Sequence, residues 1–467
     1  MSVARIAHEA GRARRQEVPR SALAALAARP EGVDPVVRLR EDTTERIPEL
    51  AALRFSRMCA SPLAFLRGAA ILMADDLASA PSSGLRVQSA GDAHVKNFGI
   101  FASPERRLVF DVTDFDETAP APFEFDVKRL AASLAVVAHD NGARADAAEV
   151  LVRRTVREYV RAMDRFAGWG RLEVWYATLD VADAFGELGG FFTDATRRDI
   201  ADLIGGVTVE STRQRYAELV DQSGGGPLLR SDPPRVTRLD DMAPSAPWRR
   251  ETAEAVLRGY RSTLVSDRRA LLDQFVLLDV AALVVGVGSV GTEGYAVLLA
   301  GRDESDLFAL QIKEARRSVL TPADDSDPGA RVVAGQRLMQ ATPDAFLGWH
   351  RASTPRGPRS FYVRQLYDRK ASVDVERLSL EQLSTYGRAC AWVLARAHAR
   401  SGNAAAIAGY LGHGGSFVDA LVAFADAYRD RTVADHTALV AAAAAGRVPV
   451  LAEPGSRPVG TLERPGT

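Results

Sequence analysis

The stretch from residue 271 to residue 315 constrains the fold of this 467-residue chain more than any other part of its sequence. It holds three apolar runs rich in strand-forming residues, separated first by a glycine turn and then by a polar turn at Arg302–Asp306. This order of strand, turn, strand, turn and strand predicts an antiparallel sheet. It argues against a dinucleotide-binding unit, because there the glycine turn opens into a helix.

The glycine turn has the pattern G-x-G-x-x-G, formed by Gly286, Gly288 and Gly291. Dinucleotide-binding and kinase-type phosphate loops both use this pattern, and the sheet context favours the kinase type, whose backbone N–H groups cover the phosphates. Lys313 ends the third apolar run, at the position from which the lysine of a kinase-type sheet reaches the phosphates. The alternative is an ordinary hairpin turn with a lysine on an edge strand.

A second polar constellation lies far earlier in the chain, between two further predicted strands. Asp92 precedes Asn97 by five residues in GDAHVKNFG, and Asp114 follows in VTDFDE. Phosphoryl transfer needs one carboxylate that accepts the proton of the attacking hydroxyl, and a carboxylate and an amide oxygen that hold Mg²⁺. Turn chemistry also explains Asp92 and Asn97 one by one. It does not explain the three further acidic residues that crowd around Asp114, namely Asp111, Asp116 and Glu117.

These loops resemble the catalytic and metal loops of the aminoglycoside and choline phosphotransferase branch of the kinase-like fold, whose pattern is H-G-D-x-H-x-x-N followed by I-D-F/W-D/E. The resemblance implies that Asp92 is the catalytic base and that Asn97 and Asp114 ligate the metal, with Asp116 as a further ligand. It also implies that Asp126, in the following helix, supports the catalytic loop. The sequence departs from the pattern at Ala90, where the branch has histidine.

The same resemblance assigns a nucleotide site to the later part of the chain. Lys313 becomes the phosphate clamp beneath the glycine loop, and the adenine of ATP lies along Tyr362–Leu366, with Gln365 and Leu366 as cofactor-binding residues. The helix expected after Lys313 offers Gln336 where an acidic partner for the lysine is usual. ATP and Mg²⁺ are the cofactors expected on this basis.

The chain from about Arg54 to about Ala427 also resembles an uncharacterised bacterial family, domain-of-unknown-function family 2252. Seven segments carry this resemblance: RMCASPLAFLRG, GDAHVKNFG, DFDET, DVKRLAAS, QIKEA, GQRLMQ and LARAHARSG. The family resemblance implies no substrate.

Taken together, the motifs predict an α+β protein with a two-lobed, protein-kinase-like fold that is circularly permuted, because the catalytic and metal loops precede the glycine loop. Permutation is tolerated where the termini of a domain lie close together. Five regions are expected: a partly mobile N-terminal arm (1–50), a helical catalytic lobe (51–270), a β-rich nucleotide-binding lobe (271–375), helices that complete the catalytic lobe (376–450) and a disordered tail (451–467).

Composition limits the partners. Lys and Arg number 59 and Asp and Glu 60, a balance that argues against nucleic-acid binding. Two cysteines supply neither a disulfide framework nor a Cys-rich zinc site. The chain begins without an apolar leader and has no apolar run of roughly 18 residues, so we expect a cytoplasmic protein without a membrane partner. A nucleotide and an unidentified small hydroxylated acceptor are the expected partners.

Three other functions stay open. A metallophosphoesterase could use Asp92, His94, Asp114, Asp116 and His413 as ligands of two metals. A nucleotide-binding pseudokinase is favoured by the absence of an acidic partner for Lys313. An adenylyl transferase would use the same metal ligands with the nucleotide reversed.

Overall fold

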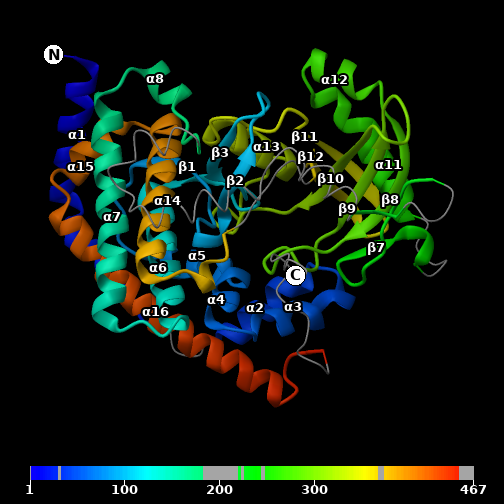
Figure 1. Cartoon of the computed structure of the whole chain (residues 1–467). Coiled ribbons are helices and arrows are strands. Elements are labelled where there is room, and N and C mark those ends of the chain that lie inside the picture. Colours follow the sequence, from blue (N-terminus) through cyan, green and yellow to red (C-terminus); the bar gives the residue numbers. More distant parts are fainter. Residues whose placement is uncertain are drawn as a thin grey trace.

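The computed structural model describes residues 2–29, 33–181, 219–221, 226–242, 248–366 and 373–451. Within these ranges the protein is a mixed α+β protein in which helices predominate, with one six-stranded sheet and three two-stranded sheets (Figure 1). No helix of the described ranges is long and apolar enough to cross a membrane. The predicted disordered tail, 451–467, lies outside the described residues apart from residue 451.

The six-stranded sheet forms around residues 271–315, the segment predicted to be an antiparallel sheet. Its strand order is β11-β12-β10-β9-β8-β7, and every pair of neighbours is antiparallel. The strands are β7 (Val236–Arg238), β8 (Val276–Leu283), β9 (Gly294–Ala300), β10 (Leu307–Ala315), β11 (Gly348–Thr354) and β12 (Gly357–Gln365). Helix α13 (Pro328–Met339) lies between β10 and β11 in the chain. The prediction of an antiparallel sheet is confirmed.

Alternation along β10 decides which face Lys313 occupies. Phe308, Leu310 and Ile312 belong to a core shared with helices α11 (Trp248–Tyr260) and α12 (Ser266–Leu272). Because successive side chains of a strand point to opposite faces, Lys313 emerges on the face away from these helices. Strand β7 and helix α11, which precede residue 271, and α12, which spans it, pack with the sheet.

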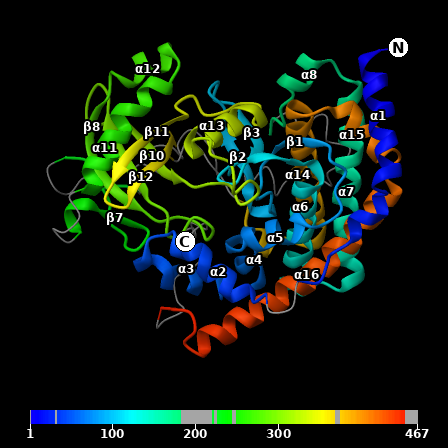
Figure 2. The same ribbon diagram turned by 180° about the vertical axis from the view of Figure 1, so that it is seen from behind.

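The helical part of the protein packs around α6 (Phe123–Asp140), which is buried over nearly its whole circumference. The surrounding helices are α7 (Ala145–Gly168), α8 (Arg171–Tyr176), α14 (Leu380–Ser401), α15 (Ala404–Leu411) and α16 (Gly415–Ala444). Seen from both sides, these helices and the six-stranded sheet stand at opposite ends of the molecule, with α13 and two small sheets between them (Figures 1 and 2). Short elements complete the fold: β5 (Val220–Asp221), β6 (Leu228–Leu229), η3 (Val95–Asn97), η5 (Leu239–Asp241), η6 (Arg261–Thr263) and η7 (Val375–Arg377).

Two small sheets bring the carboxylate-bearing loops together. Strand β1 (Arg86–Ser89) pairs with β4 (Ala119–Pro122), and β2 (Phe98–Ala102) pairs with β3 (Leu108–Val112). The loop from β1 to β2 and the loop from β3 to β4 therefore connect the same two ladders. This nested pairing places residues 90–97 beside residues 113–118.

The N-terminal region is helical and packs on the rest of the protein. Its helices are α1 (Val3–Glu17), η1 (Arg20–Ala24), α2 (Pro35–Thr44), η2 (Pro48–Leu50), α3 (Ala51–Met58), α4 (Pro62–Gly68) and α5 (Ala70–Ala78). Helix α1 lies along α15, so close that a Cβ at Gly11 would meet the carbonyl oxygen of Ala406 at 1.9 Å. Arg15 Nε donates to the carbonyl oxygen of Tyr410 at 2.9 Å. Small residues on the facing helices permit this docking.

Candidate functional site

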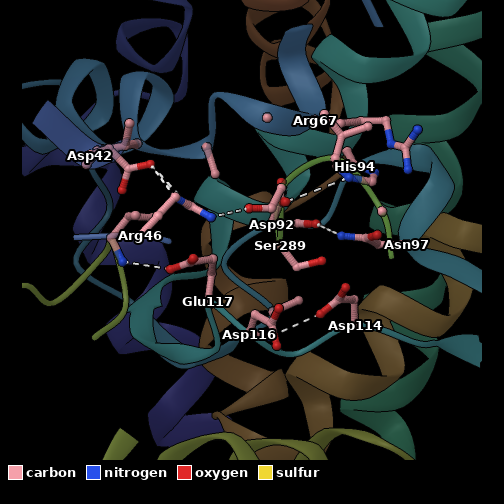
Figure 3. A pocket seen from close by; sticks show the side chains of 18 residues that line it. Asp42, Arg46, Arg67, Asp92, His94, Asn97, Asp114, Asp116, Glu117 and Ser289 are labelled. Atoms are coloured by element: carbon pink, nitrogen blue, oxygen red, sulfur yellow. Dashed lines mark hydrogen bonds and ion pairs between the residues drawn. The ribbon is translucent and has the colours of Figure 1, made fainter. Parts of the chain in front are cut away.

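One polar cavity collects the predicted site segments (Figure 3). It is lined by the glycine loop, both carboxylate-bearing loops and the helices α2, α4 and α5, and encloses about 690 Å³ when its side open to solvent is included. The lining residues are Asp42, Arg46, Arg67, Gly68, Ala70, Ile71, Ala90, Asp92, His94, Asn97, Asp114, Asp116, Glu117, Gly286, Val287, Gly288, Ser289 and Val319. Segments far apart in the chain thus face one space.

The loop from β1 to β2 is held by its own backbone and by Asn97. The amide Nδ2 of Asn97 donates to the carbonyl oxygen of Asp92 at 2.8 Å, and the backbone N–H of His94 donates to the same oxygen at 2.8 Å. Gly91 has a φ of +81°, and a Cβ there would lie 2.1 Å from the carbonyl oxygen of Glu117. Only glycine allows the two loops to approach this closely. The Oδ1 of Asn97 is left as an acceptor, the kind of oxygen that Mg²⁺ prefers.

Asp126, in α6, accepts hydrogen bonds from the start of this loop. Its carboxylate accepts from the backbone N–H groups of Ala90 at 2.7 Å and Gly91 at 3.0 Å. His398 Nε2 lies 3.1 Å from the same carboxylate, and His398 Nδ1 lies 2.8 Å from the hydroxyl of Tyr159. Sequence reasoning did not single out His398, which lies in the last turn of α14, because a single histidine in a helix carries no spacing signal.

Asp92 has a charged partner that the sequence did not suggest. Arg129 Nε, from α6, donates to Asp92 Oδ1 at 2.8 Å, and His94 Nε2 lies 3.7 Å from Asp92 Oδ2. Burial raises the pKa of Asp92, while Arg129 acts in the opposite direction. Burial, Arg67 and Arg129 hold the pKa of His94 well below its ordinary value, so its imidazole is neutral at pH 7.

Lys313 finds its acidic partner on the loop from β3 to β4. Its Nζ forms an ion pair with Asp116 Oδ2 and lies 4.0 Å from Asp114 Oδ2. Burial by itself lowers the pKa of Lys313, but Asp114 and Asp116 outweigh it and raise the pKa above its ordinary value. On α13, Gln336 donates instead to Gln340 at 2.9 Å. The acidic partner of Lys313 therefore comes from the loop between β3 and β4, and not from α13.

This ion pair bears on Asp116, which the sequence suggested as a metal ligand. Asp116 Oδ1 accepts from the Tyr362 hydroxyl at 2.7 Å, and Oδ2 pairs with Lys313. Both carboxylate oxygens are thus engaged within the protein. Asn97 and Asp114 are the other two predicted ligands; Mg²⁺ commonly takes one or two protein oxygens and completes its shell with water and phosphate.

The glycine loop is fastened through its carbonyl oxygens. Arg57 Nη1 donates to Gly286 O at 2.6 Å, and Arg46 Nη1 donates to Gly288 O at 2.7 Å and to Val290 O at 3.0 Å. Gly286 has a φ of +73°, in the left-handed region that favours glycine. Gly291 also has a positive φ, and although it does not line the cavity its carbonyl oxygen accepts from the backbone N–H of Ile47 at 2.7 Å.

The donors of the glycine loop are oriented differently from its acceptors. The backbone N–H groups of Val287, Gly288 and Ser289 have no acceptor in the part of the chain that the structure describes. These three residues line the cavity. Arginine side chains thus satisfy the carbonyl oxygens, and a run of N–H donors remains at the cavity wall, where an anion would satisfy them.

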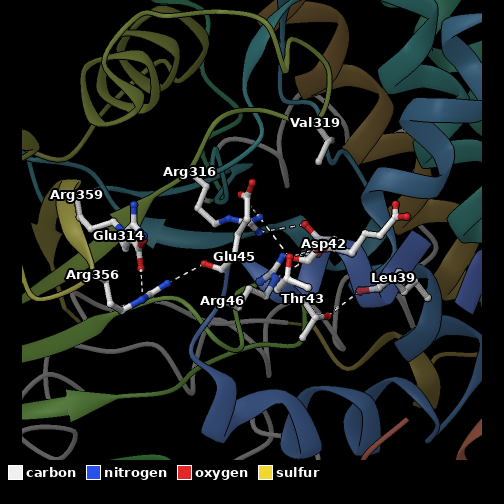
Figure 4. Close-up of polar contacts among 12 residues, drawn as sticks. Leu39, Asp42, Thr43, Glu45, Arg46, Glu314, Arg316, Val319, Arg356 and Arg359 are labelled. Atoms are coloured by element: carbon white, nitrogen blue, oxygen red, sulfur yellow. Dashed lines mark hydrogen bonds and ion pairs between the residues drawn. The ribbon is translucent and has the colours of Figure 1, made fainter. Parts of the chain in front are cut away.

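An arginine network joins the glycine loop to α2 and to the end of β10 (Figure 4). Asp42 accepts from Arg46 at 3.0 Å, from Arg54 at 2.8 Å and from Arg316 at 3.1 Å. Burial by itself raises the pKa of Asp42, but the three guanidinium groups lower it below its ordinary range. Arg356 Nη2 adds a contact to the carbonyl oxygen of Glu45 at 2.7 Å. Residues 42–46 are therefore part of the site's framework.

Four other predicted residues, Lys313 among them, lie outside the cavity lining. The backbone N–H of Gln365 donates to Asp344 at 2.5 Å, and that of Leu366 donates to the carbonyl oxygen of Ala309 at 2.9 Å. Leu366 is buried in an apolar cluster with the sheet. His413, the metallophosphoesterase candidate, is exposed in the turn between α15 and α16. Among the described residues, no three His, Cys, Asp or Glu side chains are grouped so that they could hold a metal.

The fold and the site define an α+β protein with a glycine loop and two carboxylate-bearing loops around one polar cavity. The chain belongs to the family described as an uncharacterized protein conserved in bacteria (DUF2252), which matches residues 46–442. The predicted family is confirmed, and the match begins at Arg46, which fastens the glycine loop. No curated protein and no solved structure matches the chain.

Proposed function

We propose that this protein is an ATP- and Mg²⁺-dependent phosphotransferase that acts on a small hydroxylated molecule. The six-stranded sheet and the helical part are then the two lobes of a circularly permuted kinase-like fold. The observation that carries the proposal is the shared cavity, in which the glycine loop faces the loop of Asp92 and the loop of Asp114. Lys313 does not line the cavity itself but forms an ion pair with Asp116, which does.

The groups at the cavity fit a nucleotide triphosphate. The N–H groups of Val287, Gly288 and Ser289 would receive phosphate oxygens, and Lys313 would add a positive charge from the sheet. Asn97 and Asp114 would hold Mg²⁺, which when bound neutralises charge on the phosphates. Lys313 is held in place by Asp116 and Tyr362, so its orientation is set before a ligand arrives.

Asp92 would accept the proton of the attacking hydroxyl. Its burial raises its pKa, which favours proton acceptance, and Arg129 fixes one carboxylate oxygen so that Oδ2 is the oxygen turned toward His94. Asp126 and His398 hold the backbone on which Asp92 stands. Phosphoryl transfer depends mainly on such positioning and on charge stabilisation.

The ion pair between Arg129 and Asp92 favours one second candidate, a pseudokinase that binds a nucleotide without transferring a group. A carboxylate held by a guanidinium is a weaker base than a free one. Adenylyl transfer would use the same cavity and differ in the product released. The metallophosphoesterase is disfavoured, because His413 lies outside the cavity lining and Asp116 is engaged by Lys313.

Binding and turnover measured together test the proposal. Calorimetric titration should detect ATP binding that requires Mg²⁺, and a panel of hydroxylated metabolites should include one that elicits release of ADP. Asp92→Asn should abolish ADP release and keep nucleotide binding. Release of pyrophosphate would indicate adenylyl transfer, and binding without any turnover would indicate the pseudokinase. Absence of Mg²⁺-dependent ATP binding would refute the proposal and the pseudokinase alike.

A further inference from the structure

Arg67 is a cation at the cavity whose charge is not matched by a carboxylate. It is the next-to-last residue of α4 and lines the cavity. In the described ranges its guanidinium donates no hydrogen bond and forms no ion pair, and its Nε is sealed from solvent without a partner. Arg67 is half-buried as a residue, and its sealed Nε has lost hydration that no protein acceptor replaces, which is costly.

The other cations of the cavity are matched. Arg46 pairs with Asp42, Arg129 with Asp92, and Lys313 with Asp116. Glu376 acts on Arg67 electrostatically, but its carboxylate is held by Lys96 at 2.6 Å. Burial, the largest influence, lowers the pKa of Arg67, against the raising effect of Glu376, Asp92 and Asp114. Nearby acids therefore reduce the cost of the charge without bonding to it.

His94 provides a second polar atom without a partner at the same place. His94 as a residue is 3% exposed, and its Nδ1 is sealed without a hydrogen bond in the described part of the chain. Figure 3 shows the Arg67 side chain extending beside His94, away from Ser289 of the glycine loop. A guanidinium and an imidazole nitrogen thus adjoin Asp92, the residue that would meet the acceptor hydroxyl.

We propose that Arg67 and His94 form a subsite for an anionic group of the acceptor, so that the acceptor is a hydroxylated molecule carrying a phosphate or carboxylate. This inference rests on the proposed function. A planar guanidinium matches the two oxygens of such a group, and an imidazole nitrogen adds a further polar contact. The phosphates of the nucleotide would by contrast be bound by a separate set of donors, the N–H groups of the glycine loop and Lys313.

Inorganic phosphate is the probe, titrated by calorimetry into the full-length protein alone and into protein saturated with Mg²⁺ and the non-hydrolysable analogue adenosine 5′-(β,γ-imido)triphosphate. The variants are Arg67→Met, which removes the charge, and Arg67→Lys, which keeps it. Arg258→Met is the matched control, since Arg258 is exposed on α11 and pairs only weakly with Glu254 at 3.5 Å. Thermal unfolding verifies that each variant folds, and His94→Gln carries the test if Arg67→Met does not fold.

The expected result is phosphate binding to the analogue-loaded protein that weakens at least about tenfold in Arg67→Met, the loss of one charge-assisted contact. Arg67→Lys should lose less, His94→Gln should weaken phosphate binding in the same direction, and Arg258→Met should match the wild type. Analogue affinity should stay within about twofold throughout.

Three results separate failure of the subsite from failure of the proposed function. Phosphate binding that is absent, or unchanged in Arg67→Met and His94→Gln, overturns the subsite. Loss of analogue affinity in Arg67→Met, with phosphate displaced by the analogue in the wild type, assigns Arg67 to the nucleotide and also overturns it. Wild-type protein that binds phosphate through Arg67 but binds no analogue refutes the phosphotransferase and leaves the anion subsite standing.

Discussion

His398 Nε2, on α14, lies 3.1 Å from a carboxylate oxygen of Asp126, on α6, and this contact joins two helices under the loop that carries Asp92. Asp126 also accepts from the backbone N–H groups of Ala90 and Gly91. The contact therefore couples the helical core to the position of Asp92. Substitution of Asp126 therefore tests both the stability of the core and the position of Asp92.

Asp126→Ala should destabilise the protein by on the order of 3 kcal/mol, because buried N–H donors lose their acceptor. Asp126→Asn should cost less, since an amide oxygen can still accept from one of them. Urea unfolding measures both variants. Asp419→Ala serves as the control, because this carboxylate is exposed and pairs with Arg153 at the surface, where such pairs contribute about 0–1 kcal/mol. Equal losses in Asp126→Ala and Asp419→Ala would contradict the assigned role of Asp126.

Lys313 and Asp116 should be energetically coupled. A double-mutant cycle with Lys313→Met and Asp116→Asn should give a coupling of at least about 1 kcal/mol in urea unfolding, because each single change leaves its partner unpaired in a largely buried place. Lys313→Met should in addition weaken Mg²⁺-ATP binding at least about tenfold, as the loss of a charge-assisted contact. Additive stabilities would show that the ion pair does not form in solution.

Arg129 should tune the basicity of Asp92. Because Arg129 lowers the pKa of Asp92, its removal in Arg129→Gln should raise that pKa, and the acidic limb of the pH profile of ADP release should move to higher pH. Arg129→Lys keeps the charge and should leave the limb near its wild-type position. A profile that is identical in Arg129→Gln and the wild type would rule out this tuning.

Glu117 should make stability fall as the pH rises. Burial raises its pKa from 4.5 to about 7 in the folded protein, despite a hydrogen bond from the backbone N–H of Val319. The folded state therefore keeps this proton over a range in which the unfolded state releases it. The resulting stability is fully present below about pH 4.5 and is lost as the pH rises through about 7.

Glu117→Gln removes this ionisation, so its unfolding free energy relative to the wild type should increase by on the order of 2–3 kcal/mol between pH 4 and pH 8. Urea unfolding at several pH values measures the difference, which cancels the contributions of other titrating groups. Glu149→Gln is the control, because Glu149 is exposed on α7. A constant difference between Glu117→Gln and the wild type would mean that the Glu117 pKa is ordinary.

Local sequence pattern predicts some parts of the site, and only tertiary packing brings the other parts together. The glycine loop, the strand of Lys313 and the two carboxylate-bearing loops carry signals in consecutive residues, so the sheet and the loops could be predicted. The partner of Lys313 could not, because Asp116 reaches it only through the nested pairing of β1 with β4 and β2 with β3. Arg67 and Arg129 resemble any other arginine of this chain, and only the structure places them at the cavity.

Contacts of the N-terminal region with the rest of the chain could not be predicted from composition either. Gly11 of α1 packs closely on Ala406 of α15, a contact that the Arg- and Ala-rich composition of residues 1–50 does not indicate. Farther along, Arg46 joins Asp42 to the glycine loop. Composition describes how well a segment is solvated in isolation, and it does not describe the surface that the rest of the chain offers to it.

Two glycines with the same backbone angle provide the sharpest test of the glycine loop. Gly286 and Gly142 both have a φ of +73°, so alanine at either position costs about 1 kcal/mol of backbone strain. A Cβ at Gly142 would meet nothing within 4 Å, whereas one at Gly286 would lie 3.2 Å from Ser289 Oγ, inside the cavity-lining loop.

Gly286→Ala and Gly142→Ala should lose similar stability in urea unfolding. Only Gly286→Ala should weaken Mg²⁺-ATP binding in calorimetric titration, by about fivefold or more, as expected when about 1 kcal/mol of strain displaces N–H donors from a bound phosphate. Equal nucleotide affinity in the two variants would show that the glycine loop does not bind the nucleotide, and the main support for a phosphotransferase would be lost.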